Sequence, residues 1–435
     1  MNISQSEWQG LQRLNPSELK RQIFDILQKA SIAIQEGGQD DPHLLEVVPR
    51  LADLLESKPE LKGFSEALST LARASGLWNY IDKKKAAPCD LLLAESVTVP
   101  ELDGLTLHRE QVAALNDLLA GRNLILSAPT SFGKSLLIDA LLASCKYERI
   151  AIVLPTIALL DEFRRRIKRR FGRRFDLIMH PSDETVNGRP TIFLGTQERL
   201  INRTDLGRLD LTVVDEFYKL DPNRKDERNI TLNAVVSKLL NRSNQFFFLG
   251  PNIDDVRFSV DSRWKFEFLR TRFSTVAVDT YDLGAVQNKE ARLLDEIGKD
   301  THWPALVFVS SPDKANKLAA KAAESMTVSA TSTAFADWLS ANVGPGWTVV
   351  ETVRCGFGVH HGRLPRAIAS QMVRMFNQSE LPILFCTSTL IEGVNTVAKT
   401  VLIFDKKINR SDYDFFTYSN IRGRAGRLGE HHVGQ

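Results

Sequence analysis

The sequence predicts an α/β fold with two tandem parallel-sheet domains after a small all-α domain. Two observations support this prediction. From about residue 104, short β-rich apolar runs alternate with amphipathic stretches, and a second series of the same kind begins after about residue 285. Such alternation is typical of a parallel sheet covered by helices, with functional loops at the carboxyl ends of the strands. We therefore expect three domains, at residues 1–100, 101–280 and 281–435.

The first hundred residues have helical spacing. The segment NPSELKRQIFDILQKA opens with a cap-like Asn-Pro-Ser-Glu and then places Ile23, Ile26 and Leu27 on one face. Two further stretches, HLLEVVPRLADLLE and FSEALSTLARASGLWNYI, continue the pattern. Nothing in this region resembles a reactive site, so we interpret it as a helical accessory domain.

Composition narrows the class of protein. A net charge of +3 is too small to demonstrate a nucleic-acid partner, so local clusters must decide that question. The four cysteines are far apart and lack metal-ligand spacing, which favours a reducing compartment without a zinc or iron–sulfur site. The N-terminal residues do not resemble a secretion signal, and no apolar run approaches roughly 20 residues. We therefore expect a cytoplasmic protein with no membrane contact.

The stretch SAPTSFGKS has the context of a phosphate-binding loop. It follows the apolar run NLIL and precedes the helical run SLLIDALLA, so backbone N–H groups and the positive end of a helix would face a phosphate. Lys134 could reach the outer phosphates, and the Ser135 hydroxyl could ligate Mg²⁺. Ala128 stands where the usual pattern has its first glycine. An alanine is unsuitable there only if residue 128 must adopt a positive φ. The alternative is a chance strand–turn–helix. The candidate ATP-binding residues of this loop are Ser127, Ala128, Pro129, Thr130, Ser131, Phe132, Gly133, Lys134 and Ser135.

Two further segments supply the charges that phosphate chemistry needs. In LTVVDEFY an apolar strand ends in an acidic pair, in which Asp215 could hold Mg²⁺ through water and Glu216 could orient or deprotonate the attacking water. In NIRGRAGRLG three arginines on a compact turn could approach a γ-phosphate. The alternative for the acidic pair is a solvated loop, and the alternative for the arginines is a basic surface turn. Both are less favoured because the same chain contains a candidate phosphate-binding loop.

Ten segments in order resemble the motif series of the superfamily 2 helicases of DEAD/DEAH type. They are LTLHREQ, SAPTSFGKS, LPTIALL, LGTQERL, DEFY, LGPN, LVFVSS, GVHHGRLP, TSTLIEGVN and NIRGRAGRLG. The last three are most similar to the superkiller-like branch, which also contains archaeal and eukaryotic repair helicases. The resemblance covers residues 105–430 and implies two RecA-like domains that bind ATP and Mg²⁺. Since relatives continue with a further strand, a winged-helix domain and a helical ratchet domain, it also implies an incomplete C-terminal end.

The resemblance implies roles for individual residues in the ATP site. Gln111 would read the adenine edge, and Gly133, Lys134 and Ser135 would bind the phosphates and magnesium. Asp215 and Glu216 would hold the metal and the water. The arginine fingers from the second domain would be Arg424 and Arg427, and Gly393 would contribute to the nucleotide site.

The resemblance also implies a path for nucleic acid across both α/β domains. The residues that would line it are Pro155, Thr156, Thr196, Gln197, His360, His361, Thr387 and Thr389. Small hydroxyl groups suit phosphate contacts that do not depend on sequence. The two histidines have an alternative interpretation as hydrogen-bonded loop residues. Asn252 and Asn395 would couple the path to the nucleotide.

Two departures from the helicase pattern affect this coupling. The third motif is usually a small-residue triplet with hydroxyl groups, but here it is LGPN, in which Asn252 could still relay a hydrogen bond while Pro251 lacks a donor. The acidic motif ends in FY, where relatives usually carry Ala or a β-branched residue and then Asp or His. These departures leave open whether ATP hydrolysis drives unwinding.

The run RRRIKRRFGRR, residues 164–174, is the most basic segment of the chain. Leu160, Phe163, Ile167 and Phe171 recur every three or four residues, so we predict a helix with one buried stripe and a basic outer face. Such a run is usually a solvated face. Because this one follows the LPTIALL motif, which the resemblance places beside nucleic acid, a phosphate-binding face is equally favoured.

Together these features favour an ATP-dependent helicase or translocase that moves along one strand, by resemblance in the 3′ to 5′ direction. The alternative is a nucleotide-controlled clamp that senses nucleic acid and signals to an effector. The phrases GLWNYID, GVHHGRLPRAIA and EGVNTVAKTVLIFDKKI also resemble bacterial anti-phage helicases of the Hachiman type, which implies a separate nuclease partner docked on the N-terminal helices. The choice between DNA and RNA stays open.

Overall fold

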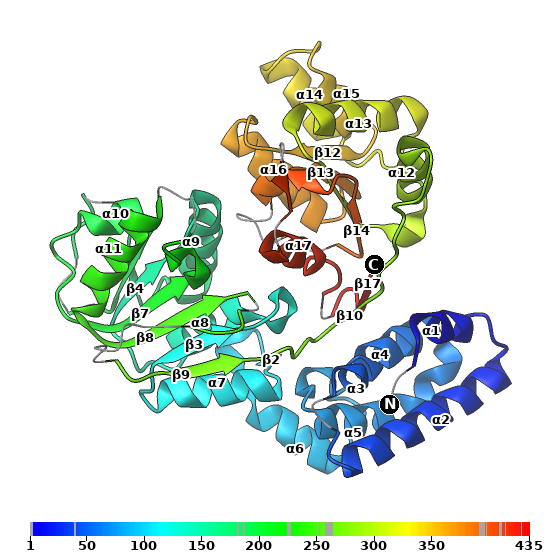
Figure 1. Cartoon of the computed structure of the whole chain (residues 1–435), viewed down its shortest axis with the longest axis horizontal. Helices are drawn as coiled ribbons and strands as arrows, with labels where there is room; N and C mark the ends of the chain where they lie inside the picture. Colours follow the sequence, from blue (N-terminus) through cyan, green and yellow to red (C-terminus); the bar gives the residue numbers. More distant parts are fainter. Residues whose placement is uncertain are drawn as a thin grey trace. The chain divides into compact units, whose positions relative to one another are not determined.

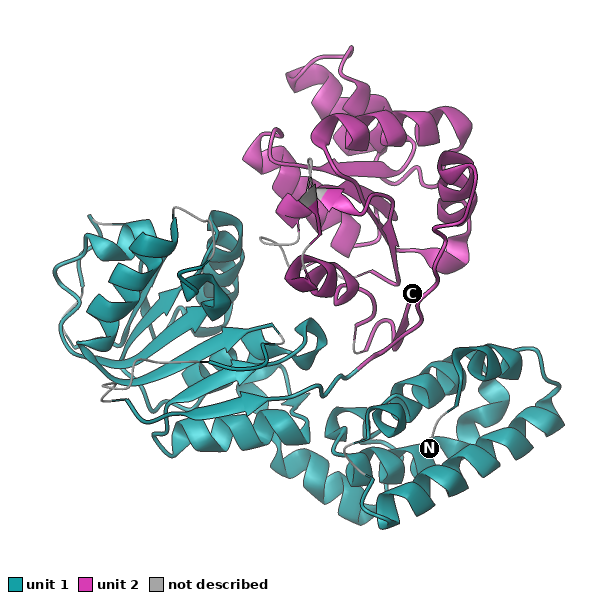
Figure 2. Ribbon diagram, in the orientation of Figure 1, with its two compact units in different colours: residues 1–275 teal, residues 276–435 magenta. Residues whose placement is uncertain are grey.

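The computed structural model divides into two compact units, Met1–Thr275 and Val276–Gln435 (Figures 1 and 2). The described residues are 3–38, 41–180, 182–185, 188–223, 228–251, 253–256, 264–390, 396, 398–408, 411–413, 415–427 and 429–435. Within them, no helix combines the length and the apolar character that crossing a membrane requires.

The first unit begins with helices, as its hydrophobic spacing predicts. Their starts follow from capping: Ser4 and Glu7 form a capping box, and Asn15 caps α2 with Pro16 as its first residue. Ile23 and Ile26 are buried, while Leu27 packs at the edge of the core. The elements are α1 (Gln5–Leu11), α2 (Pro16–Gln35), α3 (Pro42–Leu45), α4 (Val47–Ser57), η1 (Pro59–Phe64), α5 (Ser65–Ser75), η2 (Trp78–Tyr80) and α6 (Pro88–Ser96).

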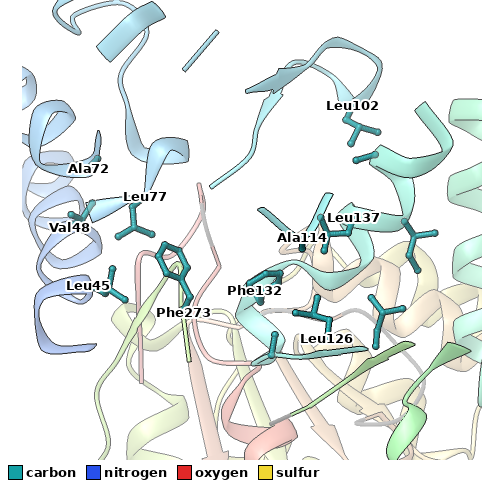
Figure 3. Close-up of a cluster of buried hydrophobic side chains, with 14 of the residues drawn as sticks. Leu45, Val48, Ala72, Leu77, Leu102, Ala114, Leu126, Phe132, Leu137 and Phe273 are labelled. Atoms are coloured by element: carbon teal, nitrogen blue, oxygen red, sulfur yellow. The ribbon is translucent and has the colours of Figure 1, made fainter. Parts of the chain in front are cut away.

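The helical region shares one hydrophobic core with the α/β part of the same unit. Leu77 and its helical neighbours belong to the cluster that includes Phe132, Leu126 and Phe273 (Figure 3). Burial of each such side chain contributes about 1.5–3 kcal/mol. The helices therefore belong to the same compact unit as the first sheet.

A seven-stranded parallel sheet is the centre of the first unit, in the order β5-β6-β4-β7-β8-β3-β9. Its strands are β3 (Leu124–Ser127), β4 (Arg149–Val153), β5 (Asp176–Ile178), β6 (Thr191–Gly195), β7 (Leu209–Asp215), β8 (Ser243–Gly250) and β9 (Glu267–Arg270). One face packs on α7 (Arg109–Leu119), α8 (Lys134–Ala143) and α9 (Ile157–Phe171), and the other on α10 (Gln197–Ile201) and α11 (Arg228–Leu240). Short elements complete the unit: β1 (Thr98–Val99), η3 (Pro100–Leu102), β2 (Leu105–Thr106), η4 (Thr130–Phe132) and η5 (Phe217–Leu220).

The second unit is built on a four-stranded parallel sheet in the order β12-β13-β11-β14. These strands are β11 (Ala305–Phe308), β12 (Phe357–His360), β13 (Ile383–Cys386) and β14 (Thr400–Ile403). Its helices are α12 (Lys289–Ile297), η6 (Asp300–His302), α13 (Pro312–Ser325), α14 (Thr333–Asn342), α15 (Thr348–Arg354), α16 (Arg366–Asn377), η7 (Ser388–Leu390) and α17 (Phe415–Arg422). Two small pairs, β10 (Ala277–Val278) with β17 (Val433–Gly434) and β15 (Lys407–Ile408) with β16 (Ser411–Asp412), lie outside the main sheet. The prediction of two parallel-sheet, RecA-like domains after a helical region is confirmed.

Candidate functional site

The phosphate-binding loop connects the end of β3 to the start of α8, as predicted. Gly133 has a φ of +80° and lies at the N-cap of α8, where a Cβ atom would be 2.7 Å from Gln111 Nε2. Only glycine therefore fits this position without strain. Ala128 is fully buried, has no positive φ, and donates its N–H to Gly250 O at 3.2 Å. The alanine therefore fits the loop, and the turn that needs glycine is at Gly133.

Lys134 lies between the loop and the acidic pair. Its Nζ donates to Ala128 O at 2.9 Å and to Pro129 O at 3.1 Å. Burial lowers the pKa of this ammonium, while the carboxylates of Glu216 and Asp215 act in the opposite direction. Ser135 is exposed on the first turn of α8. A phosphate would exchange for the carbonyl partners of Lys134, because an ammonium has three donors and no acceptor.

Asp215 ends β7, and Glu216 follows it in a left-handed conformation with a φ of +55°. The Glu216 N–H donates to Asp215 Oδ1 at 2.9 Å. Burial and the Glu216 carboxylate raise the pKa of Asp215 to about 7, while Lys134 lowers it. Glu216 Oε2 is buried and has no hydrogen-bond partner among the residues that the structure describes. Two crowded carboxylates with an unpaired oxygen fit a divalent cation, so the predicted Mg²⁺ suits this donor set.

The hydroxyl of Ser127 holds the third motif against the phosphate-binding loop. Ser127 Oγ lies 3.0 Å from both Pro251 O and Ile253 O, and it accepts the Ile253 N–H at 2.6 Å. Pro251 thus takes part through its carbonyl, although, as the sequence predicts, it has no N–H to donate. The predicted coupling residue Asn252 lies outside the described residues.

The aromatic residue that follows the acidic pair, Phe217, has a packing role. It is buried, and a Cβ atom on Gly250 would approach its Cε1 to 2.8 Å. The ring therefore packs where LGPN requires a glycine and connects the acidic motif with the third motif. Sequence reasoning missed this contact because the two residues are 33 positions apart, although an unusually large residue beside an acidic pair was a signal.

Gln111 supports the loop through contacts other than the predicted one. Its Nε2 donates to Phe132 O at 2.9 Å and its Oε1 accepts the His108 N–H at 3.2 Å. The ring of His108 is also 3.1 Å from Phe132 O through Nε2. Both ends of the Gln111 amide therefore have protein partners, and its adenine-reading role stays a prediction. Sequence reasoning missed the contribution of His108 to the loop.

The expected nucleic-acid residues of the first unit follow two neighbouring strands. Pro155 and Thr156 follow β4, Thr196 and Gln197 follow β6, and Leu154 N–H donates to Gly195 O at 3.0 Å between these strand ends. Thr156 caps α9, with its Oγ1 accepting the Leu159 N–H at 3.3 Å. Thr196 and Gln197 are buried, and Gln197 Oε1 has no hydrogen-bond partner within the described part of the chain.

The basic helix α9 contains the predicted buried stripe, because its buried residues are Leu160, Phe163, Ile167 and Phe171. Its cations serve two purposes. Arg166 Nε lies 3.1 Å and Arg170 Nη1 lies 2.7 Å from Asp139 Oδ2, a fully buried carboxylate on α8. On the helix, Arg164, Arg165, Lys168 and Arg169 are exposed, as is Arg173 just after it. Only the exposed cations are available for the predicted phosphate contacts.

In the second unit, the ends of β12 and β13 bring three of the predicted residues together. Thr387 N–H donates to His360 O at 3.2 Å, and Thr387 Oγ1 is 3.0 Å from Thr389 Oγ1. Burial, His361 and Arg424 lower the pKa of His360 to about 4, so its ring is neutral at physiological pH. His361 Nε2 lies 3.2 Å from Asn316 Oδ1, which favours the hydrogen-bonded alternative for this histidine.

The two arginines predicted as fingers have different environments. Arg424 is buried, and its Nη1 donates to Thr396 Oγ1 at 3.2 Å. The side chain of Arg427 is 47% exposed and lies 3.4 Å from Glu430 Oε1 through Nη1. Gly393 and Asn395, also predicted from the resemblance, lie outside the described residues.

A phosphate-binding loop beside an acidic strand end, followed by a second parallel-sheet unit with a Gly-Arg turn, is typical of P-loop proteins with two RecA-like units. The family comparisons agree. Residues 108–250 match the family model described as "DEAD/DEAH box helicase", and residues 347–429 match the "Helicase conserved C-terminal domain". The chain belongs to the superfamily 2 helicases of DEAD/DEAH type.

Curated relatives include defence and repair proteins. The chain is 37% identical over 394 residues to "Anti-bacteriophage protein B" of Escherichia coli K12, which covers 88% of this chain and 54% of that protein. It is 25% identical over 371 residues to "ATP-dependent DNA helicase Hel308" of Caldivirga maquilingensis, covering 74% and 48%. It is 22% identical over 381 residues to "Helicase POLQ-like" of Homo sapiens, covering 74% and 34%. The chain thus spans about half or less of the length of these relatives.

Proposed function

We propose that this chain is an ATP-driven helicase or translocase that moves along one strand of nucleic acid in the 3′ to 5′ direction. The observation that carries the proposal is the position of Lys134 beside Asp215 and Glu216 at the carboxyl edge of the first sheet. Membership of the family, the phosphate-binding loop and the capped helix α9 support it. The anti-phage role suggested by the 37% identical relative is part of the same proposal.

In the proposed reaction, Lys134 would bind the outer phosphates of ATP, and Ser135 and Asp215 would hold Mg²⁺. Bound Mg²⁺ would neutralise part of the negative charge on the phosphates. Glu216 accepts the proton of the attacking water through Oε2, the oxygen that has no partner within the described residues. Arg424 and Arg427 stabilise the charge that develops on the γ-phosphate.

The second candidate function is a nucleotide-controlled clamp that senses nucleic acid and signals to an effector such as a nuclease. The observation that favours it is Pro251, because a proline in the third motif lacks the N–H that could relay a change at the nucleotide. In this case ATP hydrolysis would reset the clamp without strand separation. The partner would be a separate protein.

The two functions are separated by measuring ATP turnover with and without single-stranded DNA or RNA at fixed salt, followed by strand displacement on a partial duplex. Stimulated turnover with displacement of the strand supports the helicase. Stimulated turnover without displacement supports the clamp. An absence of turnover with either polymer contradicts both functions. The polymer that stimulates more at the same salt concentration identifies the substrate class.

A further inference from the structure

The segment of residues 271–275, called the strap below, lies along the phosphate-binding loop and ends at the last residue of the first unit. Three contacts fix it there. Thr271 N–H donates to Ser127 O at 3.0 Å, Ser274 Oγ is 3.0 Å from Ser131 Oγ, and Thr275 Oγ1 donates to Ser131 O at 2.9 Å. The strap therefore touches the loop at its beginning and at its turn.

Aromatic packing strengthens this attachment. Phe273 is buried, and its ring stacks on His108 with centroids 4.6 Å apart, while His108 meets Phe132 edge-on at 4.8 Å. Figure 3 shows Phe273 between Leu77 of the helical region and Phe132 of the loop. Because such interiors are close-packed, a displacement of the strap is transmitted to the rings that pack on it.

The helical region holds the same strap at its end. Tyr80 Oη donates to Thr275 O at 2.6 Å, and the Arg109 N–H at the start of α7 donates to Gly76 O at 2.9 Å. Gly76 has a φ of +82°, and a Cβ atom there would lie 2.8 Å from Arg109 Cβ. The turn after α5 is therefore fitted closely to the α/β part. Thr275 receives a bond from the helical region and donates one to the loop.

We propose that Tyr80 is a positioning residue through which the N-terminal helical region sets the affinity of the phosphate-binding loop for ATP. The inference rests on the proposed ATP site. The path is short: Tyr80 fixes the Thr275 carbonyl, Thr275 Oγ1 fixes the Ser131 carbonyl, and Ser131 lies within the turn that surrounds the phosphates. The peptide after Thr275 is also where the chain passes into the second unit, so a protein that binds the helices and moves η2 changes ATP affinity.

The test is Tyr80→Phe in the full chain, which removes one hydroxyl and keeps the ring. The matched control is Tyr147→Phe, because the Tyr147 hydroxyl also donates to a backbone carbonyl, Leu118 O at 2.9 Å, in the same unit but away from the loop. We measure binding of a fluorescent ATP analogue, KM for ATP, kcat and the thermal midpoint. We expect Tyr80→Phe to weaken analogue binding and raise KM about three- to tenfold, with kcat changed less than twofold. Tyr147→Phe should lower the midpoint without changing KM.

A second variant distinguishes a path from a local effect. Thr275→Val removes the bond to Ser131 O, so it should weaken analogue binding similarly, and the double variant should be no weaker than the poorer single variant. Equal analogue affinities for Tyr80→Phe and Tyr147→Phe, or strictly additive effects of Tyr80→Phe and Thr275→Val, would overturn the proposal. If the wild-type chain binds the analogue but does not turn over ATP, the proposed function fails, while the binding data still decide the role of Tyr80.

Discussion

The carboxyl edges of the two parallel sheets differ in the chemistry that they present. In the first unit, Lys134, Asp215 and Glu216 form a half-buried group of one cation and two carboxyl groups next to a helix start. In the second unit, the edge carries a neutral His360 and the paired hydroxyls of Thr387 and Thr389. On the proposed function, the first edge would hold a charged nucleotide and the second would make uncharged contacts with a phosphate backbone. Arg424 and Arg427 are the exceptions, because they place strong cations in the second unit.

Among the variants that test this difference between the two sheet edges, Glu216→Gln should change kcat the most. The amide keeps the size of the side chain but cannot accept a proton from water, so kcat should fall more than 100-fold while ATP still binds. Turnover assays with a nucleotide-binding titration measure both quantities. Exposed Glu66→Gln on α5 is the control. Turnover within tenfold of wild type would remove Glu216 from the role of base.

Variants of the two arginines in the second unit should distinguish an effect on kcat from an effect on thermal stability. Arg424→Gln and Arg427→Gln should each lower kcat about 10- to 1,000-fold if both stabilise the γ-phosphate. Only Arg424→Gln should also lower the thermal midpoint, because it removes a buried bond to Thr396. Parallel turnover and melting measurements test this. If Arg427→Gln leaves kcat unchanged, Arg427 is a surface residue and the alternative of a basic turn is correct for it.

Two double variants on α9 should show which of its cations stabilise the fold and which bind nucleic acid. Arg166→Ala with Arg170→Ala leaves the Asp139 carboxylate buried without its partners, which should cost about 3–5 kcal/mol of unfolding free energy. Arg165→Ala with Arg169→Ala, both exposed, should leave stability unchanged and reduce the salt dependence of nucleic-acid binding by about two phosphate contacts. Denaturant titrations and binding at several salt concentrations measure these effects. An unchanged salt slope in the second pair would indicate a solvated face.

His360 should make the second unit sensitive to acid. Its pKa of about 4 lies below the unfolded value near 6.5, so the unfolded chain binds more protons between these values. The stabilising contribution is complete above about pH 6.5 and is lost as the pH falls toward 4, by about 3 kcal/mol at most. His360→Asn should flatten the pH dependence of the unfolding free energy over this interval, as measured by denaturant titrations at several pH values. Identical pH profiles for wild type and His360→Asn would contradict a neutral buried ring.

Local patterns in the sequence predict much of this structure, because the strands, the phosphate-binding loop and the buried stripe of α9 each depend on neighbouring residues. Contacts between distant residues are not visible in such patterns. Asp139 binds Arg166 and Arg170 only because α8 and α9 pack on the same face, and Gln111 bonds the loop only because α7 begins beside it. The strap is a further example, since nothing in TRFST indicates that Thr275 bonds Ser131.

The most direct test of the central claim is Lys134→Ala, with ATP turnover and single-strand binding measured on the same preparation and exposed Lys20→Ala as control. The loop assignment predicts that turnover falls to background while strand binding without nucleotide stays within about threefold of wild type, since the proposed partner of Lys134 is ATP and not the strand. Turnover that survives this change would contradict the ATP site described for the first unit.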